Sequence, residues 1–182
     1  MSTDCVFSGK KGQYAENDFK DGDTYYDRTK ALGELDDCKN VTFRNSIVGP
    51  DLNPNGIGLF NWFMHQNSDI KGFKKVLWTG QTTLQLAKTM EQASYSNVTG
   101  LFNMVPSKPI SKYDLLQLFN KYMRNSKINI NVDEINVCDK SLIRTNYSWD
   151  FIVPDYEQMV KEMAEWINEH KEFYSHYWEG NK

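Results

Sequence analysis

Tyr26-Asp27-Arg28-Thr29-Lys30 is the stretch that decides the fold, together with Ser2-Thr3-Asp4 at the start of the chain. Asp21-Gly22-Asp23-Thr24 offers helix-capping side chains just before it, so we expect a helix over residues 25–37. Tyr26 and Lys30 are four residues apart and therefore share one face of that helix. The spacing predicts that a phenol and an ammonium lie side by side on the helix surface.

This pairing suits the reduction of a ketone, which adds hydride to carbon and a proton to oxygen and so needs an acid beside the carbonyl oxygen. The phenol of a tyrosine in water has a pKa of about 10, and a nearby ammonium favours the phenolate. A lysine placed there can also bind the ribose hydroxyls of a nicotinamide cofactor, and Thr3 or Ser2 can hold the carbonyl oxygen. The spacing alone is weak, because a chain with 10 tyrosines contains about one by chance. The alternative is a half-buried aromatic and a solvated lysine.

Composition excludes several classes of protein. The 182 residues fit one domain or one and a half, with 40% hydrophobic and 25% charged residues. A net charge of -3 argues against a nucleic-acid or anionic-membrane binder, and no apolar run is long enough to span a bilayer. Cys5, Cys38 and Cys138 are odd in number and far apart, which predicts free thiols in a reducing, cytoplasmic location. Neither the cysteines nor the three histidines form a ligand set, so we expect no metal.

The remaining patterns alternate between strand and helix and indicate an α/β fold. We expect Leu32 and Leu35 of the first helix to face the core. Strands are predicted at residues 2–8, 41–48, 76–78, 100–105 and 128–132, and helices near residues 60–63, from 83, from 112 and over 155–170. Residues 9–12 have the composition of an exposed turn. Each of the five tryptophans favours core packing over stacking on a base, and Lys71, Lys74 and Lys75 favour a solvated turn.

Longer motifs carry a resemblance. Residues 2–9 (Ser-Thr-Asp-Cys-Val-Phe-Ser-Gly), Gly12-x-Tyr14-x-Glu16 and residues 26–34 together resemble the extended short-chain dehydrogenase/reductase superfamily, in its dTDP-4-dehydrorhamnose reductase-like branch of sugar-nucleotide-binding enzymes. The similarity continues through residues 44–50, 78–87, 100–106 and 110–116, and so covers nearly the whole chain.

The resemblance implies a role for each matching residue. Tyr26 would be the general acid/base, Lys30 would anchor the ribose, and Thr3 would bind the reacting oxygen, so these three are the expected catalytic residues. Substrate contact is implied for Thr3, Asp4 and Asn45, and contact with an NADP or NAD cofactor is implied for Tyr26, Lys30 and Ser46. Arg44 is not assigned, because alternation along its strand can point it away from the site.

Two features of the sequence depart from the family pattern. Asp27 stands where Gly is common, and it brings a negative charge near the site. The Gly-rich turn that binds a cofactor pyrophosphate is absent from this sequence. We therefore expect the C-terminal portion of a Rossmann-type doubly wound parallel sheet plus a small mixed α/β substrate lobe. Residues 1–50 would be the remnant of the dinucleotide-binding domain, and residues 51–182 mainly the sugar-nucleotide lobe.

The expected function is an NAD(P)H-dependent reductase of a 4-keto nucleotide sugar, in deoxysugar or surface-polysaccharide synthesis. This chain would lack the cofactor-binding half and be inactive alone. An exposed strand edge would then pair with a homo-oligomer subunit or a partner that supplies the missing half. The alternative is a non-catalytic sugar-nucleotide-binding or regulatory protein derived from such a reductase.

Overall fold

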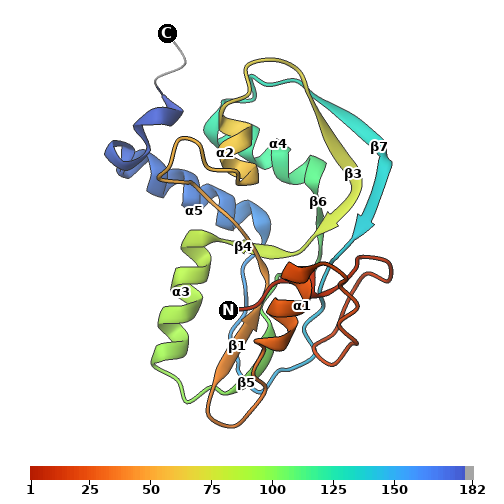
Figure 1. Cartoon of the computed structure of the whole chain (residues 1–182). Helices are drawn as coiled ribbons and strands as arrows, with labels where there is room; N and C mark the ends of the chain where they lie inside the picture. The colour runs from red at the N-terminus through yellow and green to blue at the C-terminus, as the bar shows by residue number, and fades with distance from the viewer. Residues whose placement is uncertain (179–182) are drawn as a thin grey trace.

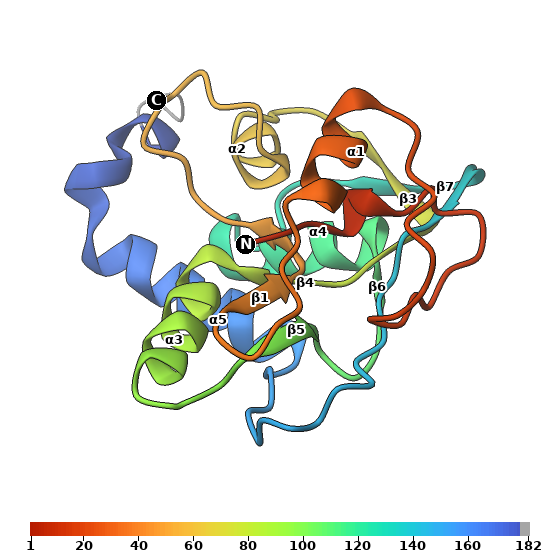
Figure 2. The ribbon, with the colours of Figure 1, turned by 60° about the horizontal axis from the view of Figure 1, so that its bottom comes forward.

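The computed structural model describes residues 1–178, which form a mixed α/β fold (Figure 1). Two short parallel pairs make its first part. β1 (Val41–Arg44) pairs with β5 (Gly100–Asn103), and β2 (Ser46–Val48) pairs with β4 (Gly80–Thr82). Ser2 extends the first pair, because its backbone N–H donates to the Phe43 carbonyl at 2.8 Å in a parallel bridge. α1 (Tyr25–Leu32) and α3 (Thr83–Ser94) lie on opposite sides of β1 (Figure 2).

The second part is a three-stranded sheet with helices packed on it. β3 (Ile70–Trp78) lies between β6 (Ile110–Ser111), which is antiparallel to it, and β7 (Ile130–Asp139), which is parallel. α4 (Lys112–Met123) packs on β3 and contacts α2 (Leu59–Met64) and α5 (Tyr156–Glu169). A 3-10 segment, η2 (Lys171–Tyr177), follows α5. None of the helices in the described residues has the length and apolarity that crossing a bilayer requires.

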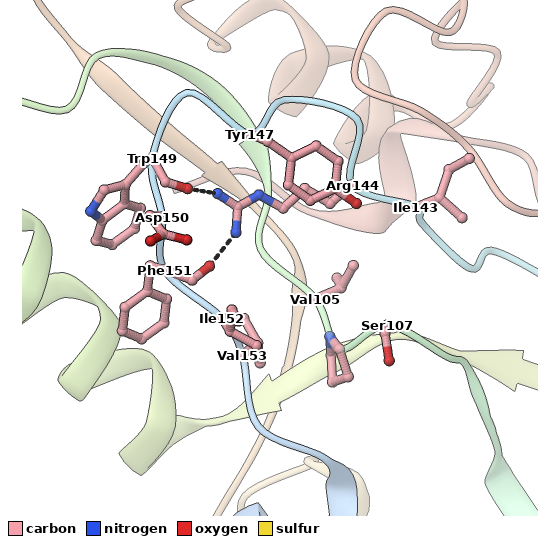
Figure 3. Close-up of a pocket in the computed structure, with 11 residues that line it drawn as sticks. Val105, Ser107, Ile143, Arg144, Tyr147, Trp149, Asp150, Phe151, Ile152 and Val153 are labelled. Atoms are coloured by element: carbon pink, nitrogen blue, oxygen red, sulfur yellow. Dashed lines mark hydrogen bonds between the residues drawn. The ribbon is translucent and has the colours of Figure 1, made fainter.

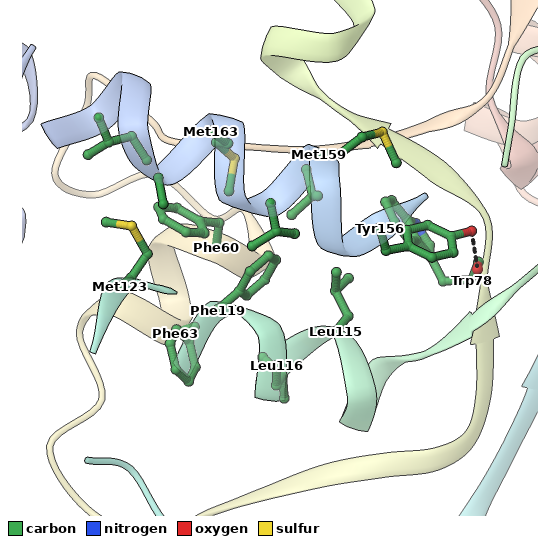
Figure 4. Packing of buried hydrophobic residues seen from close by; sticks show 14 of the residues in the cluster. Phe60, Phe63, Trp78, Leu115, Leu116, Phe119, Met123, Tyr156, Met159 and Met163 are labelled. Atoms are coloured by element: carbon green, nitrogen blue, oxygen red, sulfur yellow. Dashed lines mark hydrogen bonds between the residues drawn. The ribbon is translucent and has the colours of Figure 1, made fainter. Parts of the chain in front are cut away.

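The main hydrophobic core lies where α2, α4 and α5 meet, as Figure 4 shows. Aromatic rings dominate its centre. The Phe60 and Phe119 rings meet edge-on with their centroids 5.1 Å apart, and the centroid of the Phe63 ring lies 5.9 Å from that of Phe119. At its edge the Tyr156 hydroxyl donates to the Trp78 carbonyl at 3.3 Å, which ties α5 to the end of β3. The cluster also includes Phe43, Val48 and Phe102 of the parallel pairs, so it joins the two parts, and it contains no residue of the segment before α1 (residues 1–24, here called the first segment).

A smaller core lies under the first segment and consists of Val6, Phe7, Tyr14, Val105 and Leu142. The Phe7 and Tyr14 rings stack at 4.2 Å, and the Tyr14 hydroxyl accepts hydrogen bonds from the backbone N–H groups of residues 9 and 11. Gly12 has a φ of 73°, and a Cβ there would lie 2.3 Å from the Asp139 carboxylate. Residues 9–12 therefore form a tight turn, as predicted, and they lead into no helix.

α1 is shorter than the predicted helix. It ends at Leu32, where the Gly33 N–H still bonds back to Thr29, and the chain then turns away. Leu32 is 85% exposed and Leu35 is 49% exposed, so the prediction that they face the core was wrong. The residue of α1 that packs against the smaller core is Ala31.

Strand boundaries also differ from the prediction. Residues 41–48 form two strands that separate at Asn45, because β1 pairs with β5 whereas β2 pairs with β4. β3 begins at Ile70, well before the predicted residue 76. Lys74 and Lys75 therefore lie on a strand and not in the predicted turn. Lys74 forms an ion pair with Asp114, and Lys75 forms one with Glu134.

Candidate functional site

Three segments that are separate in sequence converge on one pocket of about 300 Å3, here called the reaction pocket. Ser2 makes an isolated parallel bridge to Arg44 at the end of β1, and the 3-10 turn η1 (Asp4–Val6) follows it, so the prediction of a strand over residues 2–8 was wrong. α1 covers this end of β1, and the Lys30 ammonium donates to the Met1 carbonyl at 2.9 Å. The lining residues are Met1, Ser2, Thr3, Asp4, Cys5, Tyr26, Lys30, Asn45, Ser46 and Ile47. All of the site residues expected from the sequence are therefore brought together.

Tyr26 and Lys30 lie on the face of α1 that borders the pocket, as their spacing predicts. Tyr26 is 57% exposed, so its ring forms the outer wall of the pocket and is not a buried core aromatic. No hydrogen bond joins Tyr26 to Lys30 among the described residues. The two residues share a face of α1, so the Tyr26 hydroxyl is free to bind a ligand.

Thr3 and Asp4 form the floor of the pocket and are 9% and 5% exposed. The Thr3 hydroxyl accepts from the Cys5 N–H at 3.2 Å and donates to the Asp4 carboxylate at 3.1 Å. Burial raises the pKa of Asp4, against the opposing effects of the Thr3 hydrogen bond and of Lys112 and Lys140. A hydroxyl and a carboxyl are thus fixed side by side in the pocket that Tyr26 also lines.

Asn45 supplies a polar atom without a partner. It is 2% exposed, and its Nδ2 donates to the Ser46 carbonyl at 3.0 Å. Its Oδ1 has no hydrogen-bond partner among the described residues. A buried acceptor that stays unpaired is costly, about 1–3 kcal/mol, which points to a ligand donor at this position.

Asp27 has a structural role that the sequence did not predict. Its backbone N–H donates to the Thr24 hydroxyl at 3.1 Å, and its carboxylate accepts from the Thr24 N–H at 3.2 Å. This reciprocal capping box begins α1, and it leaves Asp27 buried and outside the residues that line the pocket.

We expect Asp27→Ala to lower the free energy of unfolding by about 1 kcal/mol, because α1 loses a cap and a favourable charge at its N-terminus. Urea unfolding followed by tryptophan fluorescence measures the change. Asp23→Ala, an exposed aspartate in the same turn, is the matched control and should change stability little. Equal effects of the two substitutions would contradict the capping role.

A buried ion pair holds the edge that carries the pocket. The Arg44 side chain is fully buried and bonds the Glu34 carboxylate through Nε at 2.7 Å and Nη2 at 2.6 Å. Its Nη1 donates to the Asn103 side chain at 3.2 Å, which links β1 to β5. The Ser2 hydroxyl also donates to Glu34, at 2.5 Å. Arg44 therefore points away from the pocket and ties together the end of α1, the first segment and both strands.

An apolar groove of about 600 Å3, here called the lobe groove, lies between α2, β3 and α4. Trp62 and Phe73, which are 42% and 39% exposed, form part of its wall. Trp62 is thus not a core tryptophan, against the sequence-based expectation. The other lining residues are Leu59, Ile70, Lys71, Val76, Lys112 and Leu116.

A further pocket of about 400 Å3 surrounds Arg144 (Figure 3). The guanidinium donates to the carbonyls of Trp149 and Phe151, and its Nε donates to the Asn146 carbonyl at 2.8 Å. Burial lowers the pKa of Arg144. These bonds fold residues 144–151 around the side chain, so Arg144 organises the loop that borders β5.

Sequence reasoning missed Lys112. It lines the lobe groove, and burial lowers the pKa of its ammonium. One signal was present in the sequence: Lys112 follows the helix cap Ser111 directly, and a cation is unfavourable at the positive end of a helix.

Comparison with solved structures gives the same fold. The dTDP-4-dehydrorhamnose reductase from Bacillus anthracis, in complex with NADP, matches with a TM-score of 0.74 at 17% identity, over 89% of this chain and 62% of that one. The enzyme from Clostridium acetobutylicum matches with 0.73 at 20% identity, over 92% and 64%. A UDP-N-acetylglucosamine 4-epimerase from Methanobrevibacter ruminantium, in complex with UDP-N-acetylmuramic acid, matches with 0.70 at 16% identity, over 92% and 61%.

No family model matches the sequence, and no curated protein matches it. The structural matches confirm the fold class that the sequence predicted: the chain has the Rossmann-like α/β fold of these solved reductases. It spans 61–64% of the length of these solved chains.

Proposed function

We propose that this chain carries the catalytic edge and the substrate lobe of an NAD(P)H-dependent reductase of a 4-keto nucleotide sugar. The observation that carries the proposal is the convergence of Thr3, Tyr26 and Lys30 on one pocket in a fold that dTDP-4-dehydrorhamnose reductases share. The place in deoxysugar or surface-polysaccharide synthesis, and the cytoplasmic location, belong to the proposal. All three cysteines are free in the structure, which agrees with a reducing compartment.

In this proposal the chain's own residues manage the proton. Tyr26 gives its phenolic proton to the oxygen of the sugar ketone as that oxygen gains charge. In the structure the Thr3 hydroxyl donates to Asp4, and turning that proton toward the pocket would let Thr3 hold the same ketone oxygen. Lys30 places a positive charge at the mouth of the pocket, where it favours the phenolate that forms.

The reaction pocket fits the nicotinamide-ribose end of a cofactor. Asn45 Oδ1 is a buried acceptor without a partner among the described residues, which suits the N–H donor of a carboxamide. Lys30 and Ser46 border the same space and can bind hydroxyls. A bound nicotinamide cofactor would supply the hydride. NADP and NAD both remain candidates.

The pyrophosphate end does not fit the turn at residues 9–12. A phosphate site of this kind uses free N–H groups at the start of a helix. Here the N–H groups of Gly9 and Lys11 are already bonded to the Tyr14 hydroxyl. We therefore assign the pyrophosphate to polypeptide outside the described residues, whether in the same protein or in a partner subunit.

The first segment offers an edge for such polypeptide. Ser2 pairs with β1 on one side, and no strand of the described residues pairs with it on the other. Met1, Tyr26 and Ile47 around this edge are 51%, 57% and 49% exposed. A strand added there would border the reaction pocket and complete the parallel sheet.

The lobe groove is our candidate for the nucleotide. It presents the exposed rings of Trp62 and Phe73 for a base, with Lys71 and Lys112 beside them for phosphates. The proposed division follows: residues 1–50 supply the catalytic edge, and residues 51–182 mainly supply the sugar-nucleotide lobe. β4 and β5 return to pair with β2 and β1, so the two regions remain joined through shared sheets.

We expect Trp62→Ala to weaken binding of a nucleoside diphosphate by about tenfold, because stacking of a base on an aromatic ring contributes about 1–3 kcal/mol. Isothermal titration with dTDP and with UDP measures the affinity. Trp166→Ala is the matched control, since Trp166 is 40% exposed but lies on α5, away from the groove. Equal affinity of the Trp62→Ala variant and the unmodified chain would remove the base from this groove.

Isothermal titration of the chain itself tests the proposed function, with NADPH, NADH, dTDP and UDP as separate ligands. Binding of a nucleotide and of a dinucleotide supports the reductase. Binding of a nucleotide alone, persisting when candidate cofactor-binding partners are added, overturns the reductase for this chain and supports the alternative of a non-catalytic binding protein. Absence of nucleotide binding overturns both.

A further inference from the structure

β7 is an edge strand with exposed apolar side chains, and it lies at the outside of the molecule (Figure 1). It pairs with β3 on one side, and no strand within residues 1–178 pairs with it on the other. Val132, Ile135 and Val137 are 53%, 87% and 74% exposed. Because an edge of this kind presents unpaired N–H and C=O groups, a second copy of the same chain can add a strand to it. Proteins that stay monomeric protect such edges with bulges, charges or covering segments.

A bulge interrupts the middle of β7. The register pairs Asp133 with Phe73 and Val137 with Lys75. Three residues of β7 therefore lie opposite one residue of β3, and these three are here called the β7 bulge (residues 134–136). The extra residues displace the backbone from the line of the sheet and interrupt the row of groups that an added strand would bind.

The Asp133 carboxylate holds the β7 bulge. Its Oδ1 accepts from the Ile135 N–H at 2.9 Å, and the backbone N–H and side-chain Nδ2 of Asn136 both donate to the same oxygen at 3.4 Å. The hydrogen bond from the Ile135 N–H lowers the pKa of Asp133, so the carboxylate is charged at neutral pH. Two backbone donors in the middle of the strand are thus occupied by a side chain of the same strand.

The C-terminal end of β7 is occupied by another part of the chain. The Asp139 N–H donates to the Gly9 carbonyl at 3.2 Å, so the turn at residues 9–12 lies against the end of the strand. The β7 bulge and this turn leave two short lengths of uninterrupted edge, at residues 130–133 and 137–138. A strand added to so short an edge forms few hydrogen bonds.

We propose that Asp133 prevents self-association of this chain: its carboxylate keeps the β7 bulge in place and thereby blocks the addition of β7 from a second copy. Without the carboxylate, the N–H groups of Ile135 and Asn136 lose the acceptor that their own strand provides, and an incoming strand supplies one. Val132 and Val137 then make apolar contacts across the new pair of strands. None of these residues lines the reaction pocket or the lobe groove, so this role does not depend on the proposed function.

Sedimentation equilibrium of the full chain at neutral pH, over a range of concentrations, tests the proposal. Asp133→Ala should raise the self-association constant by about tenfold or more, the gain expected from two additional backbone hydrogen bonds. Asp133→Asn should behave like the unmodified chain, because its amide oxygen still accepts from the Ile135 N–H. Glu134→Ala is the matched control. It removes the same charge from the neighbouring position, where the carboxylate pairs with Lys75 at 3.8 Å, and it should leave self-association unchanged.

Hydrogen exchange of the backbone amides locates the association. Raising the concentration of Asp133→Ala should slow exchange at residues 131–137, whereas exchange there in the unmodified chain should not depend on concentration. Asp133→Val also lacks an acceptor and favours a strand, so it replaces Asp133→Ala if that variant does not fold. Unchanged self-association of Asp133→Ala overturns the proposal, as does association that leaves exchange at residues 131–137 unaltered. An equal increase in Asp133→Asn or Glu134→Ala assigns the effect to lost charge and also overturns it.

Discussion

Tyr26→Phe should lower turnover by about 10²- to 10⁴-fold in any preparation of this chain that reduces a nucleotide sugar, whichever polypeptide supplies the cofactor-binding half. The substitution removes only the phenolic hydroxyl from the wall of the reaction pocket and leaves the ring in place. The pocket would then hold the ketone beside Thr3 without an acid to protonate its oxygen. Steady-state kinetics with the nucleotide sugar and NADPH or NADH measure the loss.

Two controls separate this role from a general disturbance of α1. Tyr25→Phe alters the neighbouring tyrosine, which is 90% exposed and outside the pocket, and should leave turnover unchanged. Affinity of the Tyr26→Phe variant for dTDP or UDP should also stay unchanged, because the lobe groove lies on other elements. Near-normal turnover of Tyr26→Phe would remove Tyr26 from the acid/base role.

Arg44→Met should lower the free energy of unfolding by about 3–5 kcal/mol, the largest stability effect that we expect. Arg44 is fully buried, and its loss leaves the Glu34 carboxylate, whose side chain is 1% exposed, with only Lys20 and Ser2 as partners among the described residues. Urea unfolding measures the change. Lys20→Met removes the other cation of the cluster, which is 32% exposed, and should cost less than about 1 kcal/mol.

A double variant tests whether the cost arises from an unpaired buried charge. Adding Glu34→Gln to Arg44→Met removes that charge and should recover part of the lost stability. A cost of Arg44→Met no larger than that of Lys20→Met would contradict the structural role of the pair.

The ion pair of Arg44 and Glu34 also predicts that the protein loses stability in acid. Burial opposes ionisation of Glu34, but hydrogen bonds from Arg44, Lys20 and Ser2 outweigh it, so the pKa of Glu34 is lowered from its ordinary value of 4.5. Its contribution to stability is therefore complete above pH 4.5 and is lost as the pH falls through the lowered folded-state value. In Arg44→Met this acid-dependent part should shrink, because the strongest partner of the carboxylate is absent.

Local signals in the sequence predicted most of the elements. Thr24, Ser111 and Asp155 cap helices as their side-chain chemistry indicates, and each accepts a backbone hydrogen bond in the first turn. The Tyr26 and Lys30 spacing placed both residues on one helix face, as the pocket shows. These features depend on residues a few positions apart, and for that reason they can be predicted without knowledge of the tertiary structure.

Features that depend on partners distant in the sequence could not be predicted from the sequence. Leu32 was expected to be buried, but which face of α1 meets the core is decided by the smaller core, where Ala31 packs. Trp62 was expected in the core, but it lines the groove that β3 and α4 complete. Periodicity gives the faces of a helix or strand, not the neighbour that each face will meet.

The sequence alone thus predicted that the Tyr26–Lys30 stretch and Ser2-Thr3-Asp4 would gather at one site, and its alternating strand and helix patterns predicted an α/β fold. Only the tertiary structure decided that Asn45 leaves a buried acceptor unpaired among the described residues and that Arg44 meets the Glu34 carboxylate in a buried ion pair. The physical reason is the distance along the chain between the residues that interact. Caps and helix faces are set by contacts within one turn of the chain, whereas the field at a buried carboxyl depends on which remote strands and helices pack beside it.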